Sequence, residues 1–253
     1  MSLIGGKSGP RKEVSEVWDS RYVAEGHMWG DDPSPTLHYT REAINQHKKG
    51  QNLYLIDFGC GYGRDTVTFA EMGHHVTGID ASQQAVRLAN ENFEMRRTKG
   101  HLPGSATFSY GTITGALKQN VKQFDVIHSH RTLHLLNDKE VGSFAKEAAK
   151  RLRPGGILCI GARSPQDFKP DQMRWLKGQE GKVAEYKDPA RKGQVLNFWD
   201  QARFETTFRK DFVIEKIVEC EEQESQGNPI PTQLTIMVAR RKGEPGPSGT
   251  GSS

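Results

Sequence analysis

The chain has 253 residues, of which 34% are hydrophobic and 26% are charged, and its formal net charge is +4 at pH 7. This length predicts one domain with a substantial core, and so small a charge argues against a dedicated nucleic-acid surface. Three distant cysteines, Cys60, Cys159 and Cys220, predict free thiols in a reducing compartment. Without a membrane-spanning run or a signal-peptide pattern, we expect a cytoplasmic protein that does not enter membranes.

The first 50 residues predict two helices separated by a loop. Residues 1–12 are rich in Gly, Ser, Pro and Lys and are expected to be disordered. A short helix is predicted over residues 13–25, followed by a loop over residues 27–37 that holds Trp29 between turn-forming residues. A second helix over residues 36–48 is expected to lead into the first strand.

Residues 53–82 predict a strand, a glycine-rich loop, a helix and a second strand, in that order. Glycines at alternate positions allow the backbone to turn sharply and to approach a ligand closely. The following helix, residues 64–72, offers unpaired N–H groups at its start. Asp80 ends the second strand, 17 residues after Gly63, where its carboxylate can accept hydrogen bonds from both hydroxyls of a ribose. The unit therefore predicts a nucleoside ligand.

Two residues of this unit indicate which nucleoside it binds. Arg64 occupies the position where the dinucleotide pattern has glycine or alanine, which ranks a nicotinamide dehydrogenase last among the alternatives. Asp57, just before the loop, would repel a pyrophosphate but attract an ammonium group. A ligand with an amine, a carboxylate and a ribose fits these residues better, and S-adenosylmethionine has all three.

The rest of the chain alternates predicted helices and strands. Helices are predicted over residues 83–97, 138–152 and 197–208, and strands over residues 106–110, 124–128, 157–162, 212–220 and 234–239, the last two as an antiparallel pair. Residues 163–206 leave the carboxyl end of the fifth strand, where open α/β sheets bind ligands, so we expect this segment to cover a substrate. The low-complexity tail, residues 243–253, is expected to be disordered.

Four motifs resemble those of one family, the class I S-adenosylmethionine-dependent methyltransferases. They are DFGCGYG at residues 57–63, GIDAS at 78–82, FDVIHSHRTLHLL at 124–136 and RPGG at 153–156. The resemblance implies an α/β fold with a doubly wound, mostly parallel seven-stranded sheet that ends in an antiparallel strand pair. It implies one methyltransferase domain over residues 13–242.

The N-terminal segment narrows the resemblance. WDSRY and GHMWGDDPSP, within residues 13–50, are similar to the cap of the tellurite-resistance, thiol and thiopurine-type methyltransferases, which folds over the cofactor. By this resemblance Trp18, Tyr22 and Trp29 line the cofactor or substrate cavity. The alternative is that Trp18 and Tyr22 simply pack one helix face on the core.

Candidate binding residues follow from the motifs. The expected cofactor-binding set is Asp57, Gly59, Gly61, Gly63, Asp80, Ala81, Thr112, Ile113, Ser129, Trp18 and Trp29. The family often has an acidic residue after the third strand to bind adenine; this chain has Gly-Thr-Ile there, so backbone groups or the Thr112 hydroxyl would replace it. The expected substrate-binding set is Tyr22, Arg131, Arg163 and Trp199, with solvated surface as the alternative for the two arginines.

Three histidines follow the fourth strand. His134 and His130 are the candidates for a general base, because imidazole titrates near neutral pH, and inward packing is the alternative for each. His128 belongs to the same group. The three lack a carboxylate or cysteine at a recognisable spacing, so we expect no metal site.

The leading hypothesis is transfer of a methyl group from S-adenosylmethionine to a sulfur, nitrogen or oxygen atom of a small molecule. A cofactor-binding regulator without activity is one alternative. An RNA or protein methyltransferase is another, although HSHR stands where base-methylating enzymes carry an (N/D)PPY stretch, so a nucleic-acid partner is not expected. The sequence does not determine the oligomeric state.

Overall fold

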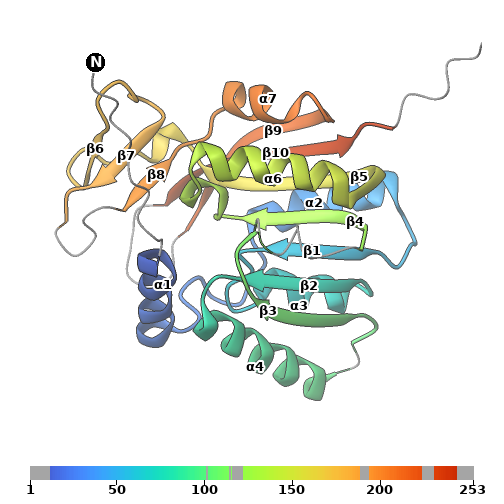
Figure 1. Ribbon diagram of the computed structural model, residues 1–253. Helices are drawn as coiled ribbons and strands as arrows, with labels where there is room; N and C mark the ends of the chain where they lie inside the picture. The colour runs from blue at the N-terminus through green and yellow to red at the C-terminus, as the bar shows by residue number, and fades with distance from the viewer. Residues whose placement is uncertain are drawn as a thin grey trace, which may run out of the picture.

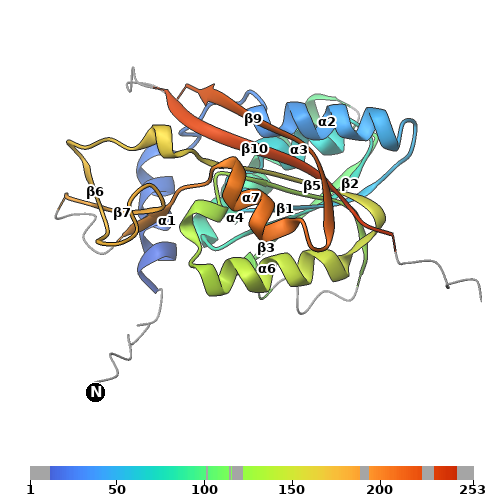
Figure 2. The ribbon, with the colours of Figure 1, turned by 90° about the horizontal axis from the view of Figure 1, so that it is seen from above.

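A computed structural model describes residues 12–100, 102–113, 115, 122–188, 194–223 and 231–243 of the chain. Its centre is a seven-stranded sheet with the order β3-β2-β1-β4-β5-β10-β9, in which only β10 runs antiparallel to its neighbours (Figures 1 and 2). The strands are β1 (Tyr54–Phe58), β2 (His75–Asp80), β3 (Ser105–Tyr110), β4 (Phe124–His130), β5 (Leu152–Arg163), β9 (Phe212–Glu222) and β10 (Thr232–Arg241). The predicted fold class is confirmed.

Helices cover both faces of this sheet. They are α1 (Lys12–Glu25), α2 (Pro35–His47), α3 (Arg64–Glu71), α4 (Gln83–Lys99), α6 (Asp138–Arg151) and α7 (Gln201–Phe208), with short 3-10 turns η1 (Leu133–Leu135) and η2 (Pro165–Asp167). Figure 2 shows α2 and α3 on one face and α6 and α7 on the other. Among the described residues, no helix has the length and apolarity needed to cross a lipid bilayer.

Side-chain caps explain why several helices begin where they do. Ser34 caps α2 and accepts a hydrogen bond from the Leu37 N–H, and Ser82 caps α4 in the same way. Asn137 caps α6 and forms a reciprocal capping box with Glu140. Five predicted helices are confirmed to within two residues at either end: those over residues 13–25, 36–48, 64–72, 83–97 and 138–152.

Two regions differ from the sequence-based expectation. The sequence predicted disorder for Lys12, but this residue is the first of α1. The predictions of disorder for residues 1–11 and 244–253 fall outside the described residues. The RPGG segment is part of β5, and the register with β4 shifts there from Phe124 opposite Leu152 to Val126 opposite Ile157. Gly155, at φ +71°, adopts the left-handed backbone that this irregularity requires.

The polar segment after β5 forms a small antiparallel sheet that sequence analysis missed. Its strands are β6 (Met173–Trp175), β7 (Val183–Tyr186) and β8 (Val195–Asn197). Because Asn197 pairs with Val183 in this sheet, the helix predicted from residue 197 begins only at Gln201, capped by Asp200. Figure 1 shows this sheet and α1 at the edge toward which β1, β2 and β4 point.

Phe144 on α6 is central to the larger of the two cores beside the sheet. Its ring lies edge-on to Phe58 of β1, at 5.9 Å, and to Phe208 of α7, at 6.3 Å. It is fully buried, so its removal would leave a cavity enclosed by three elements.

We therefore expect Phe144→Ala to lower the free energy of unfolding by about 3–5 kcal/mol, measured by urea denaturation. Phe93→Ala is the matched control, because Phe93 on α4 is only half-buried and its removal should cost clearly less. Equal losses for the two variants would show that the packing around Phe144 does not anchor α6.

Candidate active site

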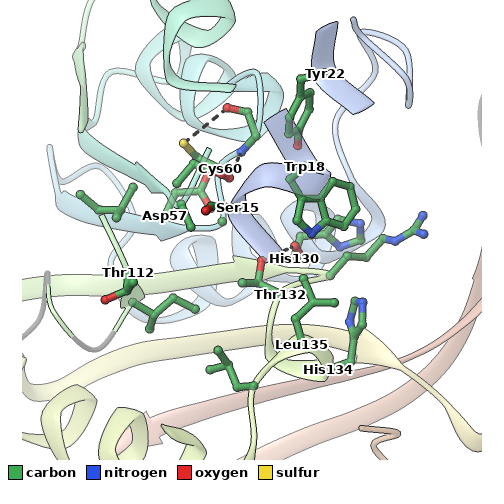
Figure 3. Close-up of a pocket in the computed structure, with 18 of the residues that line it drawn as sticks. Ser15, Trp18, Tyr22, Asp57, Cys60, Thr112, His130, Thr132, His134 and Leu135 are labelled. Atoms are coloured by element: carbon green, nitrogen blue, oxygen red, sulfur yellow. Dashed lines mark hydrogen bonds between the residues drawn. The ribbon is translucent and has the colours of Figure 1, made fainter. Parts of the chain in front are cut away.

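A cavity of about 420 Å³ opens at the carboxyl ends of the parallel strands. The loops that follow β1, β2, β3 and β4 line it together with the last residue of β5, α1 covers one side, and residues of β7 and β8 line the other. Figure 3 shows Trp18 and Tyr22 from α1 beside Asp57, Thr112, Thr132 and His134 from the strand ends. This is the volume and the position in which α/β sheets bind small molecules.

The glycine-rich loop after β1 forms the floor of one half of the cavity. Gly59, Gly61 and Gly63 all have positive φ, at +70°, +55° and +79°. A Cβ at Gly61 would lie 2.7 Å from the Tyr22 hydroxyl, and one at Gly59 would overlap the Thr132 side chain. Glycine is therefore required at both positions by conformation and by space.

Two carboxylates flank this loop. Asp57 is buried and accepts a hydrogen bond from the Thr66 hydroxyl at 2.6 Å. Asp80 accepts one from the Gly61 N–H at 2.9 Å and one from the Ser82 N–H at 2.8 Å. Burial raises the pKa of each carboxyl group to about 6, so in the ligand-free protein the charges lack full compensation. Such carboxylates favour a ligand that brings a cation and hydroxyl groups.

An aromatic cluster faces the loop from the N-terminal segment. Trp18, Tyr22, Trp29 and Tyr62 lie with neighbouring ring centroids 5.9–6.4 Å apart. The Tyr62 hydroxyl donates to the Gly30 carbonyl at 2.6 Å and accepts from the Trp29 N–H at 3.2 Å, which fixes the loop that carries Trp29. Trp18 and Tyr22 line the cavity and also pack in a buried cluster, so both sequence-based alternatives describe them in part.

Asp19 attaches α1 to the start of α4. Its carboxylate accepts hydrogen bonds from the Ser82 hydroxyl at 2.5 Å and the Gln84 N–H at 3.0 Å. The first turn of α4 follows directly on Asp80, so this contact places α1 beside the second strand end. The covering helix and the floor of the cavity are thereby joined by side-chain hydrogen bonds.

The other half of the cavity has a mixed lining. The apolar side chains are Leu135 of η1, Leu136 at its C-cap, and Tyr186 and Leu196 of the small sheet. The charged or polar side chains are Arg131 after β4, His134 of η1, Glu140 of α6 and Arg163 at the end of β5. Arg131 and Arg163 are not solvated: their side chains are only 9% and 12% exposed. The solvated-surface alternative for these arginines is therefore wrong.

A buried ion cluster supports residues that line the cavity, namely Arg64, His130 and Arg131. Glu222, at the end of β9, lies 2.6 Å from Arg64, 3.2 Å from Arg131 and 3.0 Å from His130. These neighbours hold the pKa of the Glu222 carboxyl far below its usual value. Sequence analysis missed this residue, because nothing local marks one glutamate among several in β9.

The histidines after β4 occupy different environments. His128 is buried between Asp65, at 3.0 Å from its Nε2, and Thr40, at 2.9 Å from its Nδ1. His130 likewise contacts Thr36 through Nδ1, at 2.7 Å, and Glu222 through Nε2. Burial lowers the pKa of His130 despite its carboxylate partner.

His134 is the histidine that lines the second half of the cavity, the half with the mixed lining. It is buried in η1, it lines the cavity, and its Nδ1 has no hydrogen-bond partner within the described part of the chain. Burial, together with Arg163 and Arg131, lowers the pKa of His134 well below its usual value. The imidazole is therefore neutral at physiological pH.

Most of the predicted site residues meet at this cavity. The predicted residues that line it are Trp18, Tyr22, Trp29, Asp57, Gly59, Gly61, Asp80, Ala81, Thr112, Ile113, His130, Arg131, His134 and Arg163. Gly63 does not line it but caps α3, and Ser129 is buried and donates to the Phe58 carbonyl at 2.9 Å.

The prediction for Trp199 is wrong. Its ring is fully buried in the core and packs on Phe204, at 4.8 Å, and on Phe208. The residue lies between β8 and α7 and faces the α6 side of the sheet, so it is not among the residues that line the cavity. Trp199 lies within the segment predicted to cover the substrate, but its side chain belongs to the hydrophobic core.

The groups that line the cavity suit an organic ligand better than a structural metal. Among residues 12–100, 102–113, 115, 122–188, 194–223 and 231–243, no three His, Cys, Asp or Glu side chains are grouped so that they could hold an ion. The donors at the cavity are instead carboxylates, N–H groups, guanidinium groups and aromatic rings.

Comparisons with known proteins agree with this geometry. A family profile described as a methyltransferase domain matches residues 55–156. The 27-O-demethylrifamycin SV methyltransferase of Amycolatopsis mediterranei is 27% identical over 190 residues, which cover 68% of this chain and 67% of that protein. A ubiquinone biosynthesis O-methyltransferase of Pelagibacter ubique is 29% identical over 110 residues, 44% of this chain and 42% of that one.

A solved structure shares the fold across nearly the whole chain. The magnesium protoporphyrin IX methyltransferase of Synechocystis, solved with bound S-adenosylhomocysteine, superposes with a TM-score of 0.64 at 16% identity, covering 91% of this chain and 98% of that one. The match to the ubiquinone enzyme, in contrast, spans less than half of that relative's length.

The raised pKa of Asp57 has a consequence for stability. The folded protein binds a proton at this carboxyl group up to about pH 6, whereas the unfolded chain releases it near pH 4. Folding therefore takes up a proton between these values, and this contribution to stability is lost as pH rises through the window. At pH 8 the ionised, buried carboxylate opposes folding.

We expect Asp57→Asn to raise the free energy of unfolding of the ligand-free protein at pH 8 by about 1–3 kcal/mol and to change it little at pH 4. Urea denaturation at both pH values measures the difference. Asp171→Asn is the control, since Asp171 is exposed. If Asp57→Asn instead destabilised the protein at pH 8, the carboxylate would be well compensated without a ligand.

Proposed function

Because this chain belongs to the class I S-adenosylmethionine-dependent methyltransferases, we propose that it methylates a nucleophilic sulfur, nitrogen or oxygen atom of a small molecule. One observation carries the proposal. A single cavity joins the glycine loop, Asp57 and Asp80 to a partly apolar compartment that the small sheet closes. The narrower resemblance to tellurite-resistance and thiol-type enzymes stays a prediction.

The donor set of the first half suits the cofactor. Asp57 would bind the ammonium group beside the Gly59–Gly61 turn, and Asp80 would accept hydrogen bonds from the ribose hydroxyls. Thr112 and Ile113, at the end of β3, would contact the adenine, with Trp18 and Trp29 over the cofactor. S-adenosylmethionine, when bound, supplies a methyl group on a sulfonium, which an in-line nucleophile displaces.

The chain itself contributes mainly position and exclusion of water. The aromatic cluster and the small sheet enclose the two halves of the cavity from opposite sides. Proximity and orientation alone can supply on the order of 7–11 kcal/mol of a barrier in favourable cases. The acceptor would share one cavity of about 420 Å³ with the cofactor, which supports a small acceptor rather than a nucleic acid or a protein.

For an acceptor that must lose a proton, we assign the general base to His134. His130 is less suited, because both of its ring nitrogens are held by Thr36 and Glu222. His134 lies in the second half of the cavity, where the acceptor would bind, and its Nδ1 has no hydrogen-bond partner among the described residues, so its imidazole would take the proton that a hydroxyl acceptor releases. A thiolate acceptor would not need this step.

The direct test is transfer of labelled methyl groups from S-adenosylmethionine to compounds in a metabolite extract, followed by identification of the labelled product. Labelled product supports the proposal. Calorimetric binding of S-adenosylhomocysteine without any turnover would favour a silent regulator, and absence of binding would contradict both functions.

We expect Asp80→Ala to weaken S-adenosylhomocysteine binding roughly tenfold, because two hydroxyl contacts are lost. Titration calorimetry measures the dissociation constant. Asp138→Ala serves as the control, since Asp138 is exposed at the start of α6. An unchanged constant for Asp80→Ala would refute the ribose assignment.

We expect His134→Gln to lower kcat by about 10²–10⁴-fold with a hydroxyl acceptor and much less with a thiol acceptor at pH 9, where the thiol is ionised. His38→Gln, on the exposed face of α2, should match the wild type. Equal losses with both acceptors would indicate that His134 positions the acceptor and does not take its proton.

A further inference from the structure

We propose that Arg163 and Arg131 form an anion subsite in the acceptor half of the cavity, so that the acceptor is a small organic acid: an apolar body that carries a carboxylate. This inference rests on the proposed function and goes beyond it by naming the class of acceptor. Its basis is the placement of two buried guanidinium groups at neighbouring strand ends in the wall of one cavity.

Arg163 is held in place from behind. Its Nη1 lies 2.6 Å from the Asp167 carboxylate, which is fully buried and which also accepts the Gln233 N–H at 3.1 Å. Asp167 belongs to η2 and does not line the cavity, whereas Arg163 does. The carboxylate therefore orients the guanidinium without occupying the space that the guanidinium faces.

Arg131 reaches the same cavity from the next strand along the sheet. His130 pairs with Gly161, so the chain leaves β4 at Arg131 next to the end of β5. Among the described non-glycine residues, Arg131 alone has a positive φ, at 54°. Its guanidinium lies 5.2 Å from the Trp29 ring centre and 3.2 Å from Glu222. A strained backbone at a residue that lines a cavity is a feature of functional sites.

The carboxylate partners of the two arginines do not prevent anion binding. A guanidinium carries five N–H donors in a planar fork, so a carboxylate on one edge is compatible with a second oxyanion on another. Glu140 also lines the cavity, but its carboxylate accepts the Asn137 N–H at 2.9 Å in the capping box of α6. A carboxylate acceptor would therefore meet two cations and one carboxylate that is engaged in the helix cap.

The remaining lining describes the body of the acceptor. Leu135, Leu136, Leu196 and the Tyr186 ring present apolar surface beside the arginines. Burying an apolar group there is favourable, at about 25 cal/mol per Å². His134 is neutral in this environment, so the positive charge that faces an acid comes from the arginines. An acid with an aromatic or aliphatic body matches both parts of the lining.

Calorimetry on the wild-type protein saturated with S-adenosylhomocysteine tests the subsite. The probes are three acid and amide pairs of equal shape: benzoate and benzamide, phenylacetate and phenylacetamide, hexanoate and hexanamide. We expect at least one acid to bind on the order of tenfold more tightly than its amide. If no acid is preferred over its amide, including the case in which neither binds, the inference is overturned.

Variants assign the preference to a residue. Arg163→Gln should reduce acid binding by on the order of tenfold to a hundredfold and leave S-adenosylhomocysteine binding near the wild-type value. Arg163→Lys keeps a cation against Asp167, so it should fold even if Arg163→Gln does not. Its affinity for the acid should lie between those of the wild type and Arg163→Gln. Arg87→Gln, on the exposed face of α4, is the control. Acid binding unchanged in both Arg163 variants would overturn the assignment.

The outcome for the cofactor separates this inference from the proposed function. Failure of the wild type to bind S-adenosylhomocysteine would overturn both. Normal binding of S-adenosylhomocysteine with no preference for acids would overturn the anion subsite alone and leave methyl transfer to a neutral acceptor in place.

Discussion

Charge burial is the constraint on which this cavity depends. Asp65, in the first turn of α3, is buried and must find partners inside the protein. It accepts hydrogen bonds from the Ser34 N–H and hydroxyl, at 2.8 and 2.6 Å, and contacts His128 of β4. One carboxylate thus joins the covering N-terminal segment, the helix after the glycine loop and the central strand.

Glu222 performs the same task beside Asp65, with Arg64, Arg131 and His130 as its partners. Its contacts link β9, at the edge of the sheet, with the start of α3 and the end of β4. Ion clusters of this kind contribute little net stability, but loss of one member leaves an uncompensated buried charge. The cavity wall is therefore fixed as a unit, and a ligand meets groups that are already oriented.

The sequence predicted which residues of the glycine-loop half of the cavity lie together, because the determinants of this half are local. Gly59, Gly61 and Asp80 lie within one strand-loop-helix-strand unit, and their spacing alone brings them together. The acceptor half depends on distant pairs, such as Glu222 with His130, and on a sheet whose strands have only three or four residues. Neither feature produces a periodic pattern, so β6 to β8 were missed and Trp199 was assigned to the wrong environment.

The contact between α1 and the glycine loop has a consequence for turnover. Since the Tyr22 hydroxyl leaves no space for a side chain at Gly61, the helix rests directly on the floor where a cofactor would lie. If a spent cofactor is exchanged on that side, α1 must lift and the Asp19 contacts with α4 must break. The speed of this exchange can thus be tuned at Asp19, a residue remote from both reactants, and selection could quicken the enzyme there without altering its chemistry.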